Sequence, residues 1–345
     1  MHTDPDAAAD AGVPAAVADP DAAADAGDED DADATAPEAM AAAVRKSLAE
    51  CDGVLIAFSG GVDSSVVAAL ARDALGDDAV ACTARSETLP AAELDDARRV
   101  ADEIGIRHEV VTFSELDDPD FVANGEDRCY HCRTMRLGRM YEAAHDLGIE
   151  TVCDGTNASD PGGGHRPGLQ AVEELDVRSP LLEAGIGKDD VRAIADGYGL
   201  SVADKPSMAC LSSRIPTGLE VTDERLSRIE AAERVLREWG FSQFRVRDHD
   251  GLARIEIDPD ELSAALNHDF AVAAREHLSD LGFDHVTLDL HGYRTGSVSP
   301  DEDGADDADG DDDADADDVG DTGSGVDGDP VVADVFDADY PTGGG

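Results

Sequence analysis

The feature that most constrains the fold is a regular alternation of apolar runs with helical patterns, which begins near residue 39. The run VLIAFSG (54–60) has the length and the flanks of a buried strand, and a helical pattern follows it at 64–75. The rhythm continues with strand patterns at 79–85, 107–113 and 151–156 and with helical patterns at 91–105 and up to about residue 148. Strands that alternate with helices of about ten to fifteen residues form βαβ units. We therefore predict an α/β fold, a parallel sheet with helices on both faces.

The regular alternation of strand and helix patterns ends after Pro206. A helical pattern at 222–240 precedes two close strand patterns, FRVRDH and LARIEI, and a helical pattern at 260–281 and the strand pattern HVTLDL follow. This order predicts a small α+β unit. We expect a first domain at 39–205 and a second at 206–296, in keeping with about 150 residues per domain.

Both ends of the sequence are acidic and of low complexity. Residues 1–38 contain twelve Asp and Glu, residues 297–345 contain eighteen, and neither segment contains Lys or Arg. Segments rich in Ala, Gly and Asp bury too little apolar surface to fold. We expect both to be disordered tails.

The acidic excess extends through the whole chain, which has 79 Asp and Glu against 26 Lys and Arg and a formal net charge of −53. At molar ionic strength the Debye length is about 3 Å, so salt screens the repulsion between these charges. We interpret the charge as an adaptation to the salt-rich cytoplasm of a halophile; the alternative is an acidic face for a basic partner. The charge also argues against nucleic-acid binding.

The sequence shows neither an export signal nor a membrane span. The first residues, MHTDPDAAAD, are acidic, no apolar segment follows them, and no run of about 18 apolar residues occurs. We expect a cytoplasmic protein. A reducing cytosol disfavours a structural disulfide between any of the six cysteines.

The segment AFSGGVDSS (57–65) joins the first strand pattern to a helical pattern. Two glycines allow a tight turn, and the N-terminus of the following helix presents free N–H groups to an anion. The hydroxyls of Ser59, Ser64 and Ser65 add donors, while Asp63 is placed to hold Mg²⁺ against phosphate oxygens. We interpret the segment as a phosphate-binding loop; the alternative is an ordinary tight turn with an N-cap serine.

SGGVDSS resembles the PP-loop of the ATP pyrophosphatases, which cleave ATP to AMP and pyrophosphate and adenylate a substrate. The resemblance assigns ATP binding to Ser59, Gly60, Gly61, Asp63 and Ser64. Ligands of open α/β sheets bind at the carboxyl ends of the strands. Thr83 in ACTARS and Asp154 and Asn157 in DGTN occupy such ends, so we expect them in the nucleotide pocket. The alternative for DGTN is a simple turn.

Later motifs narrow the resemblance. They are RCYHCR, DGTNASD, RPGLQA, VRSPLLEAG, DKPSMACLSSRIPTG, FRVRDHDGLARIEI and HGYRTGS. Together, and in this order from about residue 40 to 296, they resemble the LarE family. LarE proteins use ATP to adenylate the carboxylates of pyridinium-3,5-biscarboxylic acid mononucleotide and replace an oxygen by sulfur, in the biosynthesis of the nickel-pincer cofactor of lactate racemase. The resemblance implies an ATP-dependent sulfur transferase with this substrate.

Three cysteines are candidates for the sulfur chemistry: Cys129 and Cys132 in DRCYHCRTM, and Cys210 in SMACLSSR. A C-x-x-C alone leaves a zinc site, a redox pair and an iron–sulfur cluster open. Some LarE proteins sacrifice the sulfur of one cysteine, whereas others, with this three-cysteine pattern, hold a [4Fe–4S] cluster. The resemblance thus implies a [4Fe–4S] cluster on the three thiolates; in a zinc site, His131 or His165 would be the fourth ligand.

Arginines near the third cysteine are candidates for binding the substrate's phosphate. Arg214 follows Cys210 by four residues, whereas Arg245 and Arg247 alternate on the FRVR strand and so point to one face. Guanidinium groups suit a phosphate, and the resemblance implies this role for all three arginines. The alternative is a set of surface salt bridges. The resemblance also places Glu233 among the ligands of a Mg²⁺ ion.

The resemblance further implies a homo-oligomer that works with other proteins of nickel-pincer biosynthesis and takes its sulfur from a donor that the sequence does not identify. The alternative function is tRNA thiolation by a PP-loop enzyme with a [4Fe–4S] cluster. The acidic charge and the lack of a recognisable RNA-binding domain disfavour this alternative.

Overall fold

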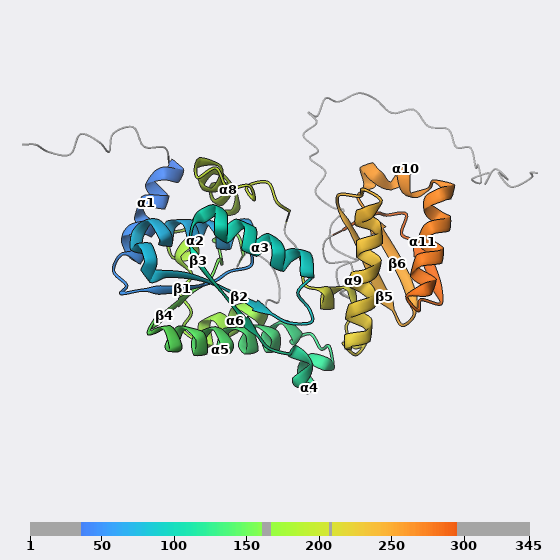
Figure 1. Ribbon diagram of the computed structural model, residues 1–345, viewed down its shortest axis with the longest axis horizontal. Helices are drawn as coiled ribbons and strands as arrows, with labels where there is room; N and C mark the ends of the chain where they lie inside the picture. Colours follow the sequence, from blue (N-terminus) through green and yellow to red (C-terminus); the bar gives the residue numbers. More distant parts are fainter. Residues whose placement is uncertain (1–35, 161–166, 207–208, 295–345) are drawn as a thin grey trace, which may run out of the picture. The chain divides into compact units, whose positions relative to one another are not determined.

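Strands β1 to β4 form a parallel sheet with the order β3-β2-β1-β4. The computed structural model describes residues 36–160, 167–206 and 209–294 (Figure 1). The four strands are β1 (Val54–Ala57), β2 (Ala79–Arg85), β3 (Arg107–Thr112) and β4 (Thr151–Cys153). The predicted α/β fold with a parallel sheet is confirmed, and β2 occupies the residues of its predicted strand pattern.

Helices cover both faces of this sheet (Figure 1). On β1, Val54 and Ile56 pack into one core and Leu55 packs into another, because successive side chains of a strand point to opposite faces. The first core contains side chains of α1 (Ala36–Leu48), α2 (Val62–Leu75), α3 (Ala91–Ile104) and α8 (Lys188–Gly197). The second contains side chains of α5 (Arg128–Leu147) and α6 (Pro167–Glu174). This burial on both faces explains the unbroken apolar run of β1 in the sequence.

The strand order creates a switch point between β1 and β4. The chain leaves β1 toward β2 and β3 and then returns past β1 to form β4 on its other side. Segments that follow β1 and β4 therefore diverge at the carboxyl edge of the sheet, which is where open α/β sheets bind ligands. The SGGVDSS loop follows β1 and the DGTN segment follows β4, so the fold brings both sequence motifs to this point.

A second sheet of three strands has the order β5-β6-β7. Its strands are β5 (Phe244–His249), β6 (Leu252–Ile257) and β7 (His285–Leu288), with β5 antiparallel and β7 parallel to β6. Side chains of α9 (Asp223–Glu238) and α11 (His268–Asp280) share a core with these strands. The predicted small α+β unit is confirmed.

The helix predicted at 260–281 is wrong in its continuity. A 3₁₀ turn at Pro259–Glu261 and the short α10 (Leu262–Ala265) precede α11, which begins only at His268. Asn267 has extended backbone angles, and its side chain accepts a hydrogen bond from the N–H of Asp269. The asparagine therefore caps a new helix, a role for which Asn is strongly preferred, instead of continuing the old one.

A further core connects the first part of the chain to α9. It contains Phe121 of α4 (Pro119–Val122), Cys132 of α5, Leu211 of the 3₁₀ turn η4 (Leu211–Arg214) and Leu226 of α9. The amide of Asn124 donates to the carbonyls of Pro216 and Leu219, both at 2.8 Å. These contacts hold the segment around Cys210 against α5.

The domain limits predicted at 38/39, 205/206 and 296/297 stay predictions. Of the first predicted tail, only residues 36–38 are described, and they begin α1. The rest of that tail, the whole of 297–345 and His165 lie outside the described residues.

Candidate active site

The SGGVDSS loop is held in shape by its own serines. The N–H of Ser59 donates to Ser64 Oγ (3.2 Å), and the Ser64 hydroxyl donates to the carbonyl of Gly61 (3.2 Å). Gly60 has φ +70, and a Cβ there would lie 2.7 Å from Cα of Ala97 on α3, so only glycine fits. Gly61 caps α2 without a side-chain hydrogen bond. The first N–H groups of α2 are thus available to an anion.

Asp63 contacts two other segments. Its Oδ1 accepts from the Asn157 amide (3.0 Å), and its Oδ2 lies 2.6 Å from Nζ of Lys188, at the start of α8. The structure therefore brings the predicted Asp63 and Asn157 together and adds a lysine. Lys188 was not predicted, although it is one of only three lysines in the chain.

Asp154 is almost fully buried, at 1 % exposure. One carboxylate oxygen accepts from the Ser179 hydroxyl (2.7 Å) and the other from the Thr156 hydroxyl (2.6 Å), and Arg133 forms an ion pair with it. The adjacent Gly155 packs so closely that a Cβ there would lie 2.7 Å from the backbone nitrogen of Ser64. DGTN therefore supports the loop, and direct contact of Asp154 with a nucleotide stays a prediction.

Thr83, at the carboxyl end of β2, is buried and donates its hydroxyl hydrogen to the carbonyl of Phe58 (2.8 Å). Its oxygen also lies 2.8 Å from His108 Nε2. Because the only hydroxyl hydrogen is used at Phe58, His108 must donate through Nε2. Burial, followed by the charge of Arg98, lowers the pKa of His108, which keeps this imidazole neutral.

One cavity of about 310 Å³ connects these groups, a volume at the lower end of the range for small-molecule sites. Loop residues, Thr83 and Asp154 line it together with Arg133, Arg136, Lys188 and Cys210. The predicted phosphate loop and the predicted sulfur-transfer cysteine thus face the same space.

Cys129 and Cys132 lie in the first turns of α5, three residues apart, the spacing that places two side chains on neighbouring positions of a helix. Cys129 is exposed and Cys132 is buried. The thiol of Cys132 donates to Oε1 of the buried Glu115 (3.2 Å) and accepts from Arg136 (3.1 Å). Burial, ahead of the neighbouring charges, raises the pKa of the Cys132 thiol to about 12.

Cys210 precedes η4, and its sulfur lies 3.1 Å from the hydroxyl of Ser212. Burial opposes ionisation of its thiol, but the positive charge of Arg128, the Ser212 hydrogen bond and then the charge of Arg136 outweigh it, so the pKa is lowered. Cys132 and Cys210 are close enough for their charges to interact. Cationic surroundings of this kind suit thiolates, the form in which cysteine binds a metal or attacks an electrophile.

A zinc site and an iron–sulfur cluster place different demands on the spacing of the three cysteines. Two thiolates on one tetrahedral zinc ion lie about 3.8 Å apart, because Zn–S bonds are about 2.3 Å. Among the described residues, the only group of three or more His, Cys, Asp and Glu whose ligand atoms all lie within 4.8 Å of one another is Asp118, Asp120 and His131. The three cysteine sulfurs therefore form no such group, so one zinc ion on all three requires that their side chains turn toward one another. In a [4Fe–4S] cluster each thiolate binds a different iron, and three thiolates are a donor set that such a cluster accepts; the cluster stays a prediction.

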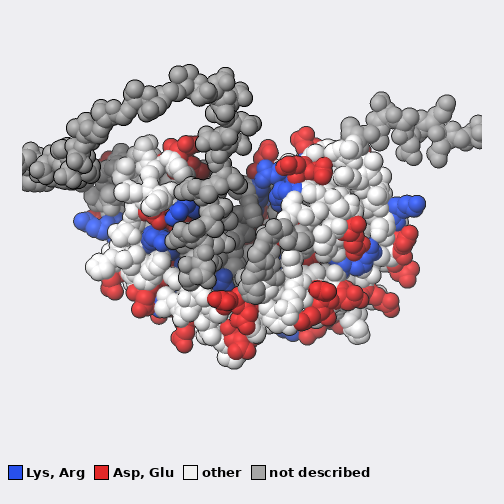
Figure 2. Space-filling view, turned by 180° about the vertical axis from the view of Figure 1, so that it is seen from behind, with Lys and Arg blue, Asp and Glu red and all other residues white. Residues whose placement is uncertain are grey.

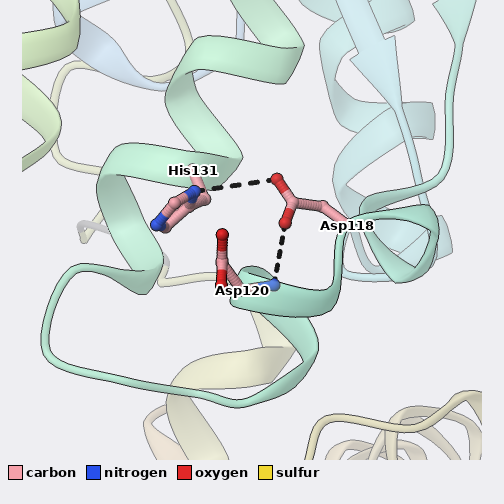
Figure 3. A group of neighbouring side chains, drawn as sticks. All are labelled: Asp118, Asp120 and His131. Carbon is pink, nitrogen blue, oxygen red and sulfur yellow. Dashed lines mark hydrogen bonds and ion pairs between the residues drawn. The ribbon is translucent and has the colours of Figure 1, made fainter.

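His131, the candidate fourth ligand of a zinc site, contacts two aspartates. Figure 3 shows its ring facing Asp118 (3.7 Å from Nδ1), and its Nε2 lies 3.3 Å from Asp127. Asp118 also caps α4 by accepting from the N–H of Asp120 (2.8 Å). Helix capping thus explains the position of Asp118, and the two aspartate contacts explain that of His131; Asp120 contributes its backbone N–H.

Two of the three predicted phosphate-binding arginines form buried ion pairs. Arg214 is fully buried and donates to both oxygens of Glu233 (2.8 and 3.0 Å), and Arg247 pairs in the same way with Glu256. Because Glu233 already accepts two hydrogen bonds from Arg214, a Mg²⁺ ion at Glu233 requires that this pair opens. The metal role of Glu233 and the phosphate roles of Arg214 and Arg247 stay predictions.

Arg245 is placed differently. It is buried, its guanidinium lies 4.9 Å from the ring centroid of Tyr293, and it donates to the Tyr293 hydroxyl (3.3 Å) and the carbonyl of Phe244 (2.8 Å). In the described part of the chain it has no ion pair with a carboxylate. Burial and then the nearby charge of Arg214 lower its pKa. An anion would relieve both effects, so Arg245 suits the predicted phosphate contact best.

Comparison with known proteins agrees with these features. The asparagine synthase family model matches residues 36–139. A protein of Synechocystis sp., slr1717, with no named function, is 43 % identical over 74 % of this chain and 95 % of its own length. The pyridinium-3,5-bisthiocarboxylic acid mononucleotide synthase of Lactiplantibacillus plantarum is 37 % identical over 73 % of this chain and 91 % of its own length. The chain belongs to the family of this synthase, the LarE family.

The LarE family lies within a wider group of PP-loop proteins. The tRNA-specific 2-thiouridylase MnmA of Caulobacter vibrioides is 34 % identical, but over only 48 % of this chain and 53 % of its own length. In the described part of this LarE-family chain, no helix is both long and apolar enough to cross a membrane.

Sequence reasoning missed several residues of this LarE-family site, among them Lys188, Arg133, Arg136 and Glu115. Each is brought to the site by tertiary structure. The only sequence signal was the scarcity of lysine, which makes Lys188 conspicuous at the start of a helix.

Proposed function

We propose that this chain is an ATP-dependent sulfur transferase that converts the carboxylates of pyridinium-3,5-biscarboxylic acid mononucleotide into thiocarboxylates. The observation that carries the proposal is the shared cavity, which residues of the SGGVDSS loop and Cys210 line together. Membership in the LarE family supports the substrate. In this role the product serves the nickel-pincer cofactor of lactate racemase.

The first step activates a poor electrophile. A carboxylate oxygen attacks the α-phosphorus of ATP, pyrophosphate leaves, and a mixed anhydride with AMP forms. We propose that the N–H groups at the start of α2 and the ammonium of Lys188 hold the pyrophosphate, because both lie at the phosphate loop. Asp63 would hold a Mg²⁺ ion, which would neutralise charge on the phosphates; its pairing with Lys188 and Asn157 holds the carboxylate at the cavity.

The second step brings sulfur to the activated carbon. We propose that Cys129, Cys132 and Cys210 would hold a [4Fe–4S] cluster, which would supply sulfur for transfer when bound. The chain's own contribution is the cationic setting made by Arg128 and Arg136, which favours anionic sulfur beside the cavity. The substrate's phosphate is assigned to Arg245, the buried guanidinium described above without a carboxylate partner.

Thiolation of tRNA is the second candidate, because the relatives named tRNA-specific 2-thiouridylases share half of this chain. The surface disfavours it. Acidic side chains occupy several areas of the face shown in Figure 2, and basic side chains occur there in smaller groups. Binding to the phosphates of a nucleic acid rests on clustered Lys and Arg.

The test compares the two substrates directly. The protein, reconstituted with iron and sulfide without oxygen, receives Mg-ATP with either the pyridinium mononucleotide or bulk tRNA, and pyrophosphate is followed in time. The proposal predicts release with the mononucleotide alone. Release that depends on tRNA instead would favour the second candidate.

A further inference from the structure

Four cationic residues line the cavity, and three of them have carboxylate partners. Arg133 forms an ion pair with Asp154, and Lys188 lies 2.6 Å from Asp63. Lys205 lies 2.9 Å from Glu93 and 2.8 Å from Asp96. The remaining cation is Arg136. Within residues 36–160, 167–206 and 209–294, Arg136 has no ion pair with any carboxylate.

Arg136 lies at the sulfur side of the cavity. It is one helical turn after Cys132 on α5, donates to the sulfur of Cys132 (3.1 Å), and is close enough to Cys210 for the two charges to interact. The carboxylate of Glu115 is nearby, and its charge acts on Arg136 without an ion pair between the two. Its Oε1 accepts from the Thr88 hydroxyl (2.9 Å) and the Cys132 thiol (3.2 Å), and its Oε2 is buried without a hydrogen-bond partner in the described part of the chain. Arg136 therefore has no direct carboxylate contact, in the described residues, that a group entering the cavity would have to displace.

We propose that Arg136 is a catalytic residue of the sulfur-transfer step, which binds the acyl oxygen of the adenylated carboxylate and stabilises the negative charge that develops there. The proposal rests on the sulfur-transferase function proposed above. The acyl carbon must lie between the loop, which holds AMP and pyrophosphate, and the sulfur near Cys210. Arg136 lines this same cavity and is the cation without a carboxylate partner in the part of the chain that the structure describes.

The charge on the acyl oxygen follows from the electron balance. An anionic sulfur nucleophile, the Cys210 thiolate or a hydrosulfide, adds to the acyl carbon and forms a C–S bond. The π electrons of the carbonyl move onto its oxygen, which becomes an oxyanion. When the carbonyl re-forms, the C–O bond to AMP breaks, and AMP leaves with the electron pair. The guanidinium of Arg136, with N–H donors in a fixed fork, matches an oxyanion that exists only in this step.

The experiment separates the two steps in the complete protein. The variants are Arg136→Gln, which removes the charge, Arg136→Lys, which keeps the charge without the fork, and Arg139→Gln as a matched control. Arg139 is on the same helix, but it is exposed and pairs with Glu142 (2.6 Å). Each protein receives Mg-ATP, sulfide and pyridinium-3,5-biscarboxylic acid mononucleotide without oxygen. Pyrophosphate, acyl-adenylate, thiolated product and iron per chain are measured.

We expect Arg136→Gln to form thiolated product about 100-fold more slowly, the cost of removing one oxyanion donor in other enzymes. Pyrophosphate release in the first turnover and iron content stay at the level of the unaltered protein, so the acyl-adenylate accumulates. Arg136→Lys should form thiolated product at a rate between those of Arg136→Gln and the unaltered protein. Arg139→Gln should behave as the unaltered protein does.

Three results would overturn the role of Arg136: unchanged thiolation in Arg136→Gln, a parallel loss of pyrophosphate release, or a loss of iron in proportion to thiolation. If Arg136→Gln does not fold, Arg136→Lys is the test. Thiolation at the full rate in Arg136→Lys would show that the guanidinium fork of Arg136 does not bind the oxyanion. An unaltered protein that releases no pyrophosphate with the mononucleotide would reject the proposed function itself, and the role of Arg136 with it.

Discussion

The ammonium nitrogen of Lys188 lies 2.6 Å from Oδ2 of Asp63, across 125 residues of sequence. This contact ties the start of α8 to the phosphate loop at the switch point of the sheet. It also brings one positive and one negative charge together at the site proposed above for ATP and Mg²⁺. Both side chains remain partly exposed, at 33 % and 25 %, so both can exchange partners when a ligand enters.

Lys188→Met is expected to lower the rate of pyrophosphate release by about 100-fold, because the developing charge on the leaving pyrophosphate loses a cationic partner. The free energy of unfolding should change by no more than about 1 kcal/mol, since partly exposed ion pairs contribute little. Lys46→Met, at an exposed position of α1, is the matched control. Equal rates in the two variants would remove Lys188 from the reaction.

Gly155→Ala tests the contact between DGTN and the loop. A Cβ at residue 155 would lie 2.7 Å from the nitrogen and 3.0 Å from Cα of Ser64, so backbone must shift. We expect a loss of about 1–3 kcal/mol in the free energy of unfolding, as in other overpacked sites, together with weaker ATP binding. Urea unfolding and ATP titration measure the two effects.

Gly138→Ala is the control for that substitution. Gly138 is in α5, and a Cβ there has no neighbour within 4 Å. Alanine should stabilise the helix by about 0.5–1 kcal/mol and leave ATP binding unchanged. Weak ATP binding in both variants would show that the effect is not specific to the loop.

Arg214→Met should destabilise the protein by about 3–5 kcal/mol, because it leaves the buried carboxylate of Glu233 without its charged partner. Arg139→Met, which removes an exposed pair on α5, should cost less than about 1 kcal/mol. The measurement is urea unfolding of both variants at one salt concentration. Similar losses would mean that the Arg214–Glu233 pair is not the structural contact described above.

The sequence predicted the sheet well because its signals are local. The apolar runs and the glycines of the PP-loop are consecutive in the chain, and so are the residues of β2, whose limits agree with the structure. The prediction of one continuous helix at 260–281 was wrong because of another local signal. The side chain of Asn267 caps a new helix, and this outweighed the periodic pattern that runs through residue 267.

The candidate site was predictable only in part. Asp63 and Asn157 come together because each follows a neighbouring strand, which the topology of parallel sheets dictates. The partners of the arginines are not dictated in this way. Arg214 and Arg136 look alike in sequence, but one is neutralised by Glu233 and the other faces the cavity without a carboxylate partner in the described residues. Only tertiary contacts separate a structural arginine from a candidate for catalysis.

Replacement of Cys129, Cys132 or Cys210 by Ala should abolish iron binding and sulfur transfer and leave pyrophosphate release intact. The unaltered protein, reconstituted without oxygen, should bind about four irons per chain. Cys51→Ala is the control, because Cys51 packs against the core that contains α1, α2, α3 and α8. Iron-free protein that still transfers sulfur, and becomes about 34 Da lighter at Cys210 by forming dehydroalanine, would establish a sacrificial cysteine in place of the cluster.

The most direct test of ATP-dependent sulfur transfer is the mass of the product. The reconstituted protein is incubated without oxygen with Mg-ATP, sulfide and pyridinium-3,5-biscarboxylic acid mononucleotide, and the mononucleotide is analysed by mass spectrometry. We predict a species about 16 Da heavier for each oxygen replaced by sulfur, formed only with ATP and with one AMP released for each oxygen replaced. A mononucleotide that stays unchanged in mass while the protein forms AMP would contradict the account.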